Sequence, residues 1–576
     1  MKPKIQKRGQ KIVKRLERFS TRAKKDGKKH IREKLINRLP NARQVRIFIL
    51  EWGLLVIAII SLAITQAFWY SQSYSAEAYV AGGTYIEGTT GAVNSLNPLF
   101  STTNSEKALS KLMFATLTTV DYSGHIGMGL AASVTPDETG EVWTLTLRDH
   151  LTWSDGTPIT LDDVLYTIDL ITDPTLNTSY SSNLTGVQVE QVDQSIVFRL
   201  PSAYADFATT LNFPLLPAHL LRDTPSSQLL EHTFSTNPIT SGAFTYNATQ
   251  NLTTDGERLV YLSANPEYYR GQPLLDTFAI HAYPETADLV TALSTGEITA
   301  TAELSPQDAS LLASSSINQR QTAISNGVFA FLNTASSALS SASVRQAIRQ
   351  GINLDSVRSV LSGESPLDYP ILSSEIELEN YPPLPAYDPE AARATLAASG
   401  LADQTLRLVT INTDYFPELA SVLERELESL GLKVEVSLYE PGQDFLLNII
   451  RPRNYDILLY EVELGADPDL FAYYYSTQAS SSGLNLSNYR NSLVDDLILG
   501  ARSTLDQSLR VAKYESFLRQ WVDDVPAIGL YQVNLTYFYN QSARTFSEDN
   551  RLVYATDRFS DVETWAVVRA ARNRTP

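Results

Sequence analysis

The 576-residue sequence contains no cysteine, and it has only three methionines and six histidines. The absence of cysteine excludes disulfide bonds, zinc–thiolate sites, a cysteine nucleophile and a lipid-modified cysteine anchor. The sequence also lacks the H-E-x-x-H motif of zinc peptidases and the G-x-S-x-G motif of serine hydrolases. We therefore expect no catalytic residues, no metal ligands, no cofactor and no enzyme activity. A surface peptidase is the alternative that a peptide-hydrolysis assay would test.

Charge is distributed unevenly along the chain, whose net charge is −18. Residues 1–46 hold 18 Lys/Arg against three acids, which leaves 28 Lys/Arg against 61 Asp/Glu in the remainder. The 18 residues from 53 to 70 carry no charge and end in Trp69 and Tyr70. Such a run is just long enough to cross a bilayer core of roughly 30 Å, and basic residues before a span stay on the cytoplasmic side. The pattern predicts a cytoplasmic segment over 1–46, a single-pass transmembrane signal-anchor over 47–70 and an extracellular or periplasmic acidic domain.

Two alternatives apply to this N-terminal region. Small residues in the segment SYSAEAYVAGG offer a place where a signal peptidase could cut, although the basic and apolar parts are longer than those of most signal peptides. The basic segment has only Phe19 as an aromatic residue for stacking on bases, so we expect no nucleic-acid partner and favour contact with the lipid surface. Residues 71–81 are expected to be a linker.

The acidic domain has the pattern of an α/β protein. Residues 142–148 alternate apolar and polar side chains, as a half-buried strand does. Residues 406–415 predict a strand, residues 419–430 have apolar side chains at helical spacing, Gly431 ends that helix, and residues 433–440 resume as a strand. Such βαβ units build parallel sheets.

Two further segments have a clear pattern. Residues 343–352 place apolar side chains at i, i+3, i+4, i+7 and i+8, which predicts a helix with one buried face. Residues 365–385 are rich in proline and serine and are expected to form a surface connection.

Several aspartates cluster in WSDGTPITLDDVLYTIDL, residues 153–170. Asp155 with the glycine after it is typical of a turn, and Thr160 followed three residues later by Asp163 has capping-box spacing. Asp162 and Asp163 fall in the first helical turn, where negative charge is favoured. We therefore interpret the cluster as a turn and a helix start rather than a catalytic or metal site.

Eight segments occur in the order in which similar segments occur in one protein family. They are GGTYIEGTTGAVNSLNPLF, GEVWTLTLRDHLTWSDGTPITLDDV, PITSGAFTY, LSANPEYYRGQPLLD, SVRQAIRQGI, YDPEAARATLAASG, ADPDLF and PAIGLY. On these segments the chain resembles the family 5 extracellular solute-binding proteins of ABC importers, the peptide- and nickel-binding group. The resemblance spans about residues 82–531 and implies solute binding without a chemical reaction.

This resemblance implies an α/β fold of the periplasmic-binding-protein type II kind, with two lobes, an inserted lobe and, here, a preceding transmembrane helix. The implied parts are lobe I at 82–112, 232–326 and 527–576, the inserted lobe II at 113–231, and lobe III at 327–526. Closure of the lobes around a ligand shifts the population toward the closed state. Permease subunits would recognise that state, and the protein is expected to be a monomer.

The resemblance also implies candidate binding residues. In dipeptide-binding relatives, an Asp three residues before an Asp-Pro pair holds the peptide ammonium, and an Arg in an Arg-Pro-Tyr loop holds the carboxylate by charge-assisted hydrogen bonds. Here those positions are Leu464 and Thr413, whereas Tyr415 matches the family tyrosine. A gap in the alignment would place Asp467 in the ammonium role, and Glu463 is a neighbouring candidate.

The missing arginine argues against strict dipeptide recognition and for oligopeptides held mainly through their backbone. The polar run Ser101, Thr102 and Thr103 matches the lobe I loop that touches ligand in relatives, and simple turn capping is its alternative. Tyr473 and the two tyrosines after it could line side-chain pockets, although at least one of three consecutive residues must face elsewhere.

Other ligands and roles stay open at this point. A nickel or other metal chelate is the second candidate within the family, but the five histidines after the basic segment have no ligand spacing, which argues against direct coordination by a histidine cluster. They are His125, His150, His219, His232 and His281. A ligand sensor that uses the same fold is the third candidate. The acidic charge favours neutral or cationic ligands.

Overall fold

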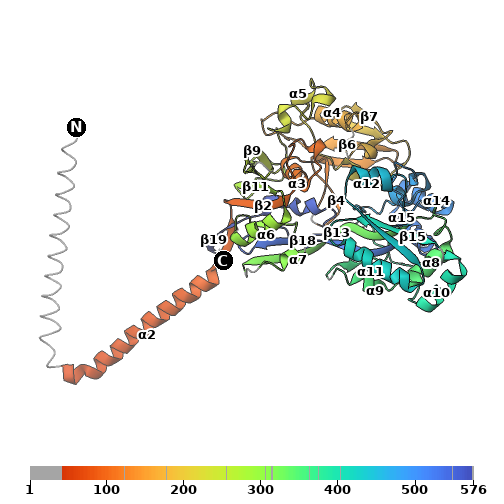
Figure 1. Cartoon of the computed structure of the whole chain (residues 1–576). Helices are drawn as coiled ribbons and strands as arrows, with labels where there is room; N and C mark the ends of the chain where they lie inside the picture. Colours follow the sequence, from red (N-terminus) through yellow and green to blue (C-terminus); the bar gives the residue numbers. More distant parts are fainter. Residues whose placement is uncertain are drawn as a thin grey trace. The chain divides into compact units, whose positions relative to one another are not determined.

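The computed structural model describes residues 42–573, apart from residues 122, 177, 179, 254–255, 305, 313–315, 362, 374, 402–403 and 548. The chain divides into two compact units, Tyr79–Val568 and the combination of Met1–Ala78 with Arg569–Pro576 (Figure 1). The predicted cytoplasmic segment at 1–46 lies almost entirely outside the described residues.

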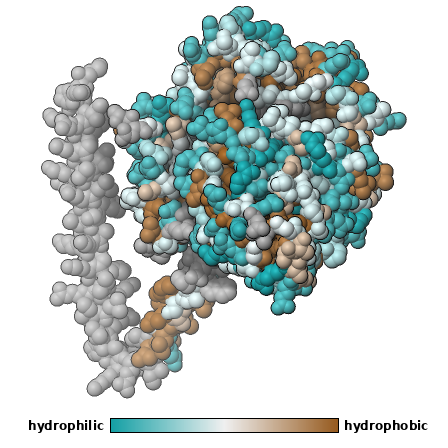
Figure 2. Space-filling view, turned by 45° about the vertical axis from the view of Figure 1, so that its right-hand side comes forward, coloured by the Kyte–Doolittle hydropathy of each residue, from teal (hydrophilic) through white to brown (hydrophobic). Residues whose placement is uncertain are grey.

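The smaller unit contains the helix α2, Ala42–Tyr74, and most of the paired strands β1, Ser75–Val80, and β19, Val568–Asn573. The described side chains of α2 are exposed and mostly hydrophobic (Figure 2). Within the described part of the chain, however, no helix combines the length and the apolar character that crossing a membrane requires. The transmembrane signal-anchor predicted at 47–70 is therefore not supported, although the segment is helical.

The larger unit is built on one large mixed sheet. Its main path, in spatial order, is β16 (Lys433–Tyr439), β15 (Thr405–Ile411), β17 (Ile457–Glu463), β13 (Ile317–Leu332), β18 (Ala527–Asn540), β12 (Ala300–Thr301), β2 (Thr84–Thr90), β11 (Thr277–Tyr283), β10 (Arg258–Ala264) and β9 (Phe244–Asn251), and β14 (Ser365–Pro366) pairs with β18. Two parallel groups, β16-β15-β17 and β12-β2-β11, lie on either side of the long antiparallel pair β13 and β18. Figure 1 shows this pair in the middle of the unit.

Smaller sheets and helices complete the unit. The strands β5 (Ala131–Pro136), β6 (Val142–Leu147), β8 (Ser195–Arg199) and β7 (Gln188–Val192) form a four-stranded antiparallel sheet, and β3 (Thr118–Val120) pairs with β4 (Ile126–Met128). The longer helices are α3 (Asn104–Met113), α4 (Leu161–Thr172), α6 (Thr286–Thr295), α8 (Ala342–Gly351), α10 (Pro389–Ala398), α11 (Phe416–Ser429), α14 (Ser492–Ser503) and α15 (Gln507–Asp524). The predicted α/β class is confirmed.

The hydrophobic core follows the two faces of the sheet. On β13, Val328 and Ala330 pack with side chains from α8, α10 and α11, whereas Phe329 and Phe331 pack on the other face with side chains from α14 and α15. This alternation is the period-2 pattern of a strand covered on both faces. A third large cluster joins β2, β11 and α3 to residues of the four-stranded sheet.

The local predictions for regular structure are confirmed. The βαβ unit is β15, α11 and β16, with β15 and β16 parallel and Gly431 at φ +88° after the helix. The helix at 343–352 is α8, whose apolar stripe is buried.

The aspartate cluster also has the predicted role. Asp163 is 3% exposed, and its carboxylate accepts hydrogen bonds from the N–H groups of Thr160 and Ala218, both at 2.8 Å. Asp162 forms an exposed ion pair with Arg222 at 2.6 Å. The cluster therefore fixes the start of α4 and the segment that follows Pro217.

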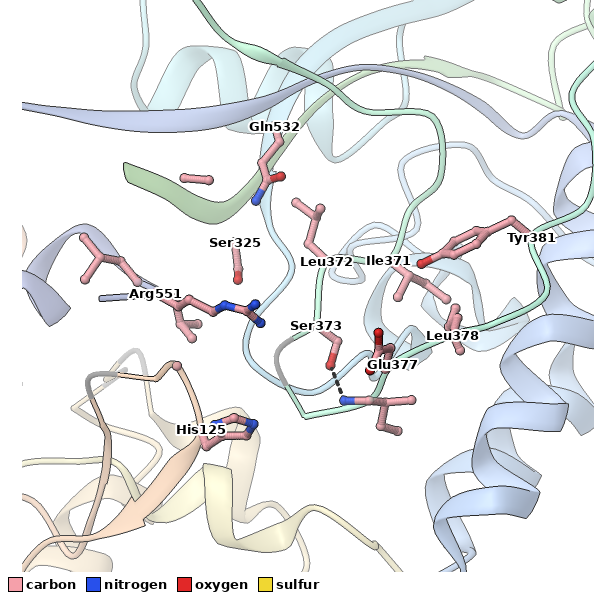
Figure 3. A pocket seen from close by; sticks show the side chains of 15 residues that line it. His125, Ser325, Ile371, Leu372, Ser373, Glu377, Leu378, Tyr381, Gln532 and Arg551 are labelled. Carbon is pink, nitrogen blue, oxygen red and sulfur yellow. Dashed lines mark hydrogen bonds between the residues drawn. The ribbon is translucent and has the colours of Figure 1, made fainter. Parts of the chain in front are cut away.

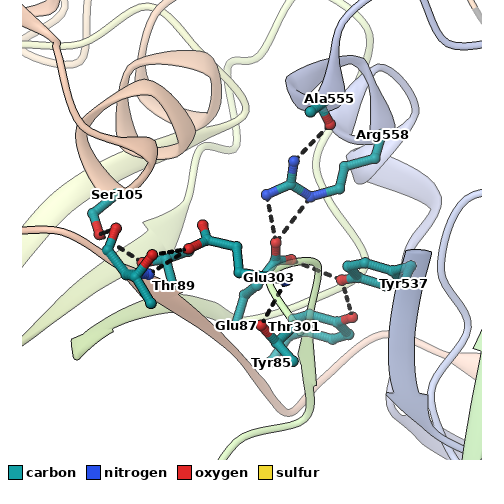
Figure 4. Close-up of polar contacts among 10 residues, drawn as sticks. Tyr85, Glu87, Thr89, Ser105, Thr301, Glu303, Tyr537, Ala555 and Arg558 are labelled. Carbon is teal, nitrogen blue, oxygen red and sulfur yellow. Dashed lines mark hydrogen bonds and ion pairs between the residues drawn. The ribbon is translucent and has the colours of Figure 1, made fainter. Parts of the chain in front are cut away.

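A buried polar network attaches the C-terminal part of the larger unit to the sheet (Figure 4). Arg558 donates to Glu87 Oε1 from Nε at 2.9 Å and from Nη2 at 2.6 Å, and the Tyr537 hydroxyl donates to Glu87 Oε2 at 2.7 Å. Both charged side chains are almost completely buried. Removal of one partner of such a pair leaves an unpaired buried charge, so the network holds Arg558 beside the sheet.

Candidate functional site

Several polar side chains meet at the carboxyl ends of the parallel strands β15 and β17. The strand β15 ends at Ile411, and residues 412–415 lead into α11, while β17 ends at Glu463. In open α/β sheets ligands bind at this edge. β13 is the antiparallel neighbour of β17 and places Asn326 opposite Glu463.

Three cavities adjoin at this edge, and Glu463 lines all of them. The first, of about 260 Å³, is lined by Asp414 and Glu461 together with Asn326 and Phe416, and the described residues of its wall include no basic side chain. The second, of about 440 Å³, has a mostly apolar and aromatic wall that includes Tyr473. We call the three cavities lined by Glu463 the Glu463 site.

The third cavity, of about 370 Å³, reaches from Glu463 to Ser101 and Lys111. Lys111 is paired with Asp557 at 3.0 Å, next to the buried Arg558 network. Glu463 at the end of β17 and side chains from α3 and the segment before it therefore face the same space.

The electrostatics of the Glu463 site are dominated by acids, of which Glu461 and Glu364 are half-buried. Glu461 accepts a hydrogen bond from Asn326 Nδ2 at 2.7 Å, and burial raises the pKa of its carboxyl group. Nearby, burial raises the pKa of Glu364 to about 7, although the N–H of Asn534 donates to that carboxylate at 2.7 Å. A cationic group would compensate these acids.

The predicted residues Ser101, Thr102 and Thr103 have different surroundings in the structure. Ser101 lines the third cavity. Thr103 instead caps α3, since its hydroxyl accepts from the N–H of Glu106 at 3.2 Å, and the Thr102 N–H donates to the Glu106 carboxylate at 2.9 Å. Thr102 and Thr103 therefore have the capping contacts of the alternative interpretation, and their predicted contact with ligand stays a prediction.

Thr413 and Tyr415 lie in the turn before α11. The Thr413 carbonyl accepts from the N–H of Phe416 at 3.2 Å, and the Tyr415 hydroxyl lies 3.5 Å from Glu461 Oε2. Asp414 between them, not Thr413, is part of the cavity wall.

The two candidates for the ammonium role at 464 and 467 are both buried. Leu464 is 8% exposed, and its N–H donates to the carbonyl of Ser325 at 2.7 Å. Asp467 is 6% exposed and forms an ion pair with Arg510 at 2.5 Å. Burial raises the pKa of Asp467 to about 6, although Arg510 acts in the opposite direction. Glu463 is exposed and belongs to the cavity walls, so it is the accessible carboxylate of this group.

The three consecutive tyrosines separate as expected. Tyr473 lines the second cavity, and its hydroxyl donates to the carbonyl of Glu463. Tyr474 is 1% exposed in the core, and the ring of Tyr475 stacks on Phe471 with centroids 4.5 Å apart.

Sequence reasoning missed Asp414, Asn326 and Glu461 as members of the site. The segment ILLYEVE offered a signal for Glu461, because strands of parallel sheets are usually continuous hydrophobic runs and an acid near their end is unusual. Asn326 gave no local signal, because its contact with Glu461 depends on strands 135 residues apart.

One group outside this site has the side chains of a metal site. Atoms of Glu257, His281 and Glu297 lie within 4.8 Å of one another. These side chains already satisfy one another, since His281 Nε2 lies 2.8 Å from Glu257 and the Tyr283 hydroxyl lies 2.7 Å from His281 Nδ1. We assign no metal to this group.

An α/β unit with cavities at the carboxyl ends of parallel strands defines a ligand-binding protein. Residues 125–484 match the family described as bacterial extracellular solute-binding proteins, family 5, middle part. This match covers more than half of the chain, and the chain belongs to that family. The predicted family is confirmed. The solute-binding role, the extracellular or periplasmic location of the solute-binding domain and the non-enzymatic character follow from this family.

Relatives share sequence over much of the chain. The oligopeptide-binding protein AppA of Bacillus subtilis is 24% identical over 480 residues, which are 79% of this chain and 87% of AppA. Protein XP55 of Streptomyces lividans is 26% identical over 420 residues, which are 67% of this chain and 72% of XP55.

Solved structures share the fold. The structure of Bacillus subtilis AppA in complex with a nonapeptide has a TM-score of 0.69 at 22% identity and covers 85% of this chain and 100% of AppA. NikZ of Campylobacter jejuni in complex with Ni(L-His) also has a TM-score of 0.69, at 21% identity, and covers 84% of this chain and 99% of NikZ.

Proposed function

We propose that this protein is the substrate-binding protein of an ABC importer and that it captures oligopeptides at the Glu463 site. The observation that carries the proposal is that one accessible carboxylate lines three adjoining cavities at the carboxyl ends of β15 and β17. Separate cavities around one anchoring charge suit a ligand with several side chains. Relatives named as oligopeptide-binding and peptide-binding proteins support the same ligand class.

In this proposal Glu463 and Glu461 hold the peptide ammonium. Both carboxylates line the first cavity, and a charge-assisted hydrogen bond to one of them would offset the cost of removing the ammonium from water. Asp467 is the weaker candidate, because Arg510 already occupies its Oδ2. Its Oδ1 is buried without a partner in the described part of the chain.

The remaining cavities would accept side chains of the peptide. The second cavity combines Tyr460, Phe445 and Tyr473 with apolar side chains, which suits an apolar or aromatic residue. The third cavity would bring Ser101, from the segment between β2 and α3, to the ligand. Thr413 replaces the carboxylate-binding arginine of dipeptide-binding relatives, which favours peptides longer than two residues.

Delivery would follow the lobe arrangement implied by the family. Lobe I at 82–112, 232–326 and 527–576 and lobe III at 327–526 would close over the peptide, with the inserted lobe II at 113–231 beside them. β13 and β18 connect the two parallel groups of strands. Bending of this pair would therefore open or close the space between lobe I and lobe III. A closed monomer would then dock on the permease subunits.

Native mass spectrometry of the full chain, purified without denaturation, tests the ligand class. Released peptides of mixed sequence and narrow length would support oligopeptide capture. A metal chelate or a single non-peptide mass would replace the proposal. A protein that is empty and whose melting temperature ignores peptide pools would instead favour a sensor role.

A pair of variants tests the site itself. Glu463→Gln removes the accessible charge, and calorimetric affinity for a released peptide should fall by about tenfold or more, because charged hydrogen bonds contribute about 1.5–3 kcal/mol. Glu435→Gln changes an exposed acid of β16 that lines none of the three cavities, and it should leave affinity unchanged. Equal affinity in both variants would contradict the assignment of Glu463.

A further inference from the structure

A fourth cavity, of about 730 Å³, shares no lining residue with the three cavities around Glu463. Its wall comes from the loop between β3 and β4, from β13 and β18, and from residues 371–381 and 551–553 (Figure 3). The volume lies within the range of ligand pockets, about 300–1,000 Å³. Residues 371–381 belong to the segment expected to be a surface connection, but Ile371, Ile376 and Leu378 are buried. We call this space the Arg551 cavity.

The Arg551 cavity and the Glu463 site both border the bulge of β13. Between Ala323 and Gly327, β13 contains a bulge in its pairing with β18. Within the bulge Ser325 faces the Arg551 cavity and Asn326 faces the Glu463 site, as successive side chains of an extended chain do. The Ser325 N–H donates to the carbonyl of Val553 at 2.9 Å, which attaches the bulge to residues 551–553.

Arg551 contributes to this cavity a cation without a partner among the described residues. Figure 3 shows its guanidinium directed into the space between Ser325 and His125. It makes no hydrogen bond or ion pair with any residue that the structure describes, whereas the neighbouring Arg558 is held by Glu87. In a chain with far more acids than bases, an arginine left without an acid is available to an anionic ligand.

Other groups in the wall suit a carboxylate. The Ser325 hydroxyl, on a residue that is 8% exposed, faces the same space and can donate a hydrogen bond. His125 contributes a ring whose Nδ1 lies 3.0 Å from the Ser123 hydroxyl. Glu377 is the acid among the described lining residues, and it forms no ion pair with Arg551.

We infer that the Arg551 cavity binds a carboxylate group of the ligand, with Arg551 as its bidentate partner and Ser325 as an additional donor. A guanidinium presents two parallel N–H groups that match the two oxygens of a carboxylate. If the carboxylate is the C-terminus of the captured peptide, the inference rests on the proposed function and adds a second anchor to it. Arg551 would then supply, at a different place in the fold, the carboxylate partner that Thr413 cannot provide. A free small carboxylic acid has the same chemistry and is the other source.

The main test compares acid and amide forms of one probe on the full chain. Calorimetry with Lys-Ala-Ala-Ala and its C-terminal amide should show tighter binding of the acid by about tenfold or more in the wild type. Arg551→Gln should make the two affinities equal, and Arg551→Lys should retain part of the preference. Arg544→Gln is the matched control, because Arg544 is exposed and lines none of the four cavities.

A second probe distinguishes failure of this inference from failure of the proposed function. N-acetylalanine and its amide carry only the carboxylate end, and ligand-observed NMR should detect the acid with wild type and Arg544→Gln but not with Arg551→Gln. If N-acetylalanine binds through Arg551 while neither peptide binds, oligopeptide capture fails and the carboxylate site stands. If acid and amide bind equally, if Arg551→Gln leaves the preference intact, or if neither probe binds the wild type, the carboxylate site is overturned.

Discussion

At the scale of single residues, the charge of Glu461 in the Glu463 site depends on burial. Burial raises its pKa, while the hydrogen bond from Asn326 acts in the opposite direction. The free protein therefore retains this proton above about pH 4.3, the ordinary value for glutamate. A cationic ligand favours the ionised form, so binding releases the proton wherever the free group holds it. We expect affinity for a peptide with a free ammonium to rise as the pH increases above that value.

Glu461→Gln tests this pH dependence. The variant should lose part of the rise in affinity with pH, and calorimetry in two buffers of different ionisation enthalpy should show less proton release than in the wild type. Asp414, Glu463, Tyr415 and Glu364 face the same region and retain their own contributions. An identical pH profile in the variant would exclude Glu461 from the ammonium site.

The sequence could narrow the candidate binding residues only to short segments. The Asp-Pro motif led to 463–467, but the choice between Glu463 and Asp467 depends on Arg510, a partner 43 residues away. No local pattern shows that such a partner occupies a carboxylate. Arg551 was not identified for a related reason, since its cavity is formed by segments from five parts of the chain.

At the scale of elements, two adjacent aspartates at the start of α4 have different structural roles. Asp163→Ala would leave the N–H groups of Thr160 and Ala218 without their acceptor, and the cost should be about 2–4 kcal/mol of unfolding free energy. Asp162→Ala removes only an exposed ion pair with Arg222 and a helix-dipole contact, which should cost about 1 kcal/mol or less. Denaturant unfolding of both variants measures the difference, and equal losses would contradict it.

The crossing of β18 with the segment after β14 requires a glycine at 529. A Cβ atom there would lie 2.4 Å from the carbonyl oxygen of Leu367, a backbone atom that cannot turn aside. Gly529→Ala should therefore lower stability by about 1–3 kcal/mol and the melting temperature with it. Gly500→Ala is the control, because the Cβ would meet only the flexible end of Lys513. Similar melting temperatures for both variants would show that the crossing can relax.

Elements with a strong local pattern could be predicted, and pairings between distant strands could not. The βαβ unit and α8 follow from apolar spacing and a terminating glycine. The segment at 365–385 has the composition of a surface loop, but four of its apolar side chains are buried because they pack against core side chains of β13, β17 and β18. They are Leu367, Ile371, Ile376 and Leu378.

At the scale of the whole molecule, the excess of acids should act on ligands before they bind. Residues 47–576 hold 61 Asp/Glu against 28 Lys/Arg. Their field should speed the approach of cationic peptides, and salt should screen it beyond about 10 Å at 0.1 M. Stopped-flow association of a cationic peptide should therefore slow as salt increases, with dissociation changing less. An anionic peptide should show the opposite trend, and rates independent of ligand charge would contradict this expectation.

The protein family could be predicted because eight segments, each only weakly specific, occur in the order typical of that family. No single segment would identify the family. The position of the lobes stays a prediction, since Tyr79–Val568 is one compact unit and one core cluster contains side chains of both lobe I and the inserted lobe. The membrane span predicted at 47–70 is not supported, because among the described residues no helix is long and apolar enough to cross a membrane.

The bulge in β13 has a consequence for how ligand preference can change during evolution. Ser325 and Asn326 are consecutive, yet each belongs to the wall of a different cavity. A substitution at one position alters recognition on one side and leaves the opposite wall intact. Successive mutations could therefore select a new partner for one end of a ligand without losing the other, and neither step would disturb the sheet that carries both.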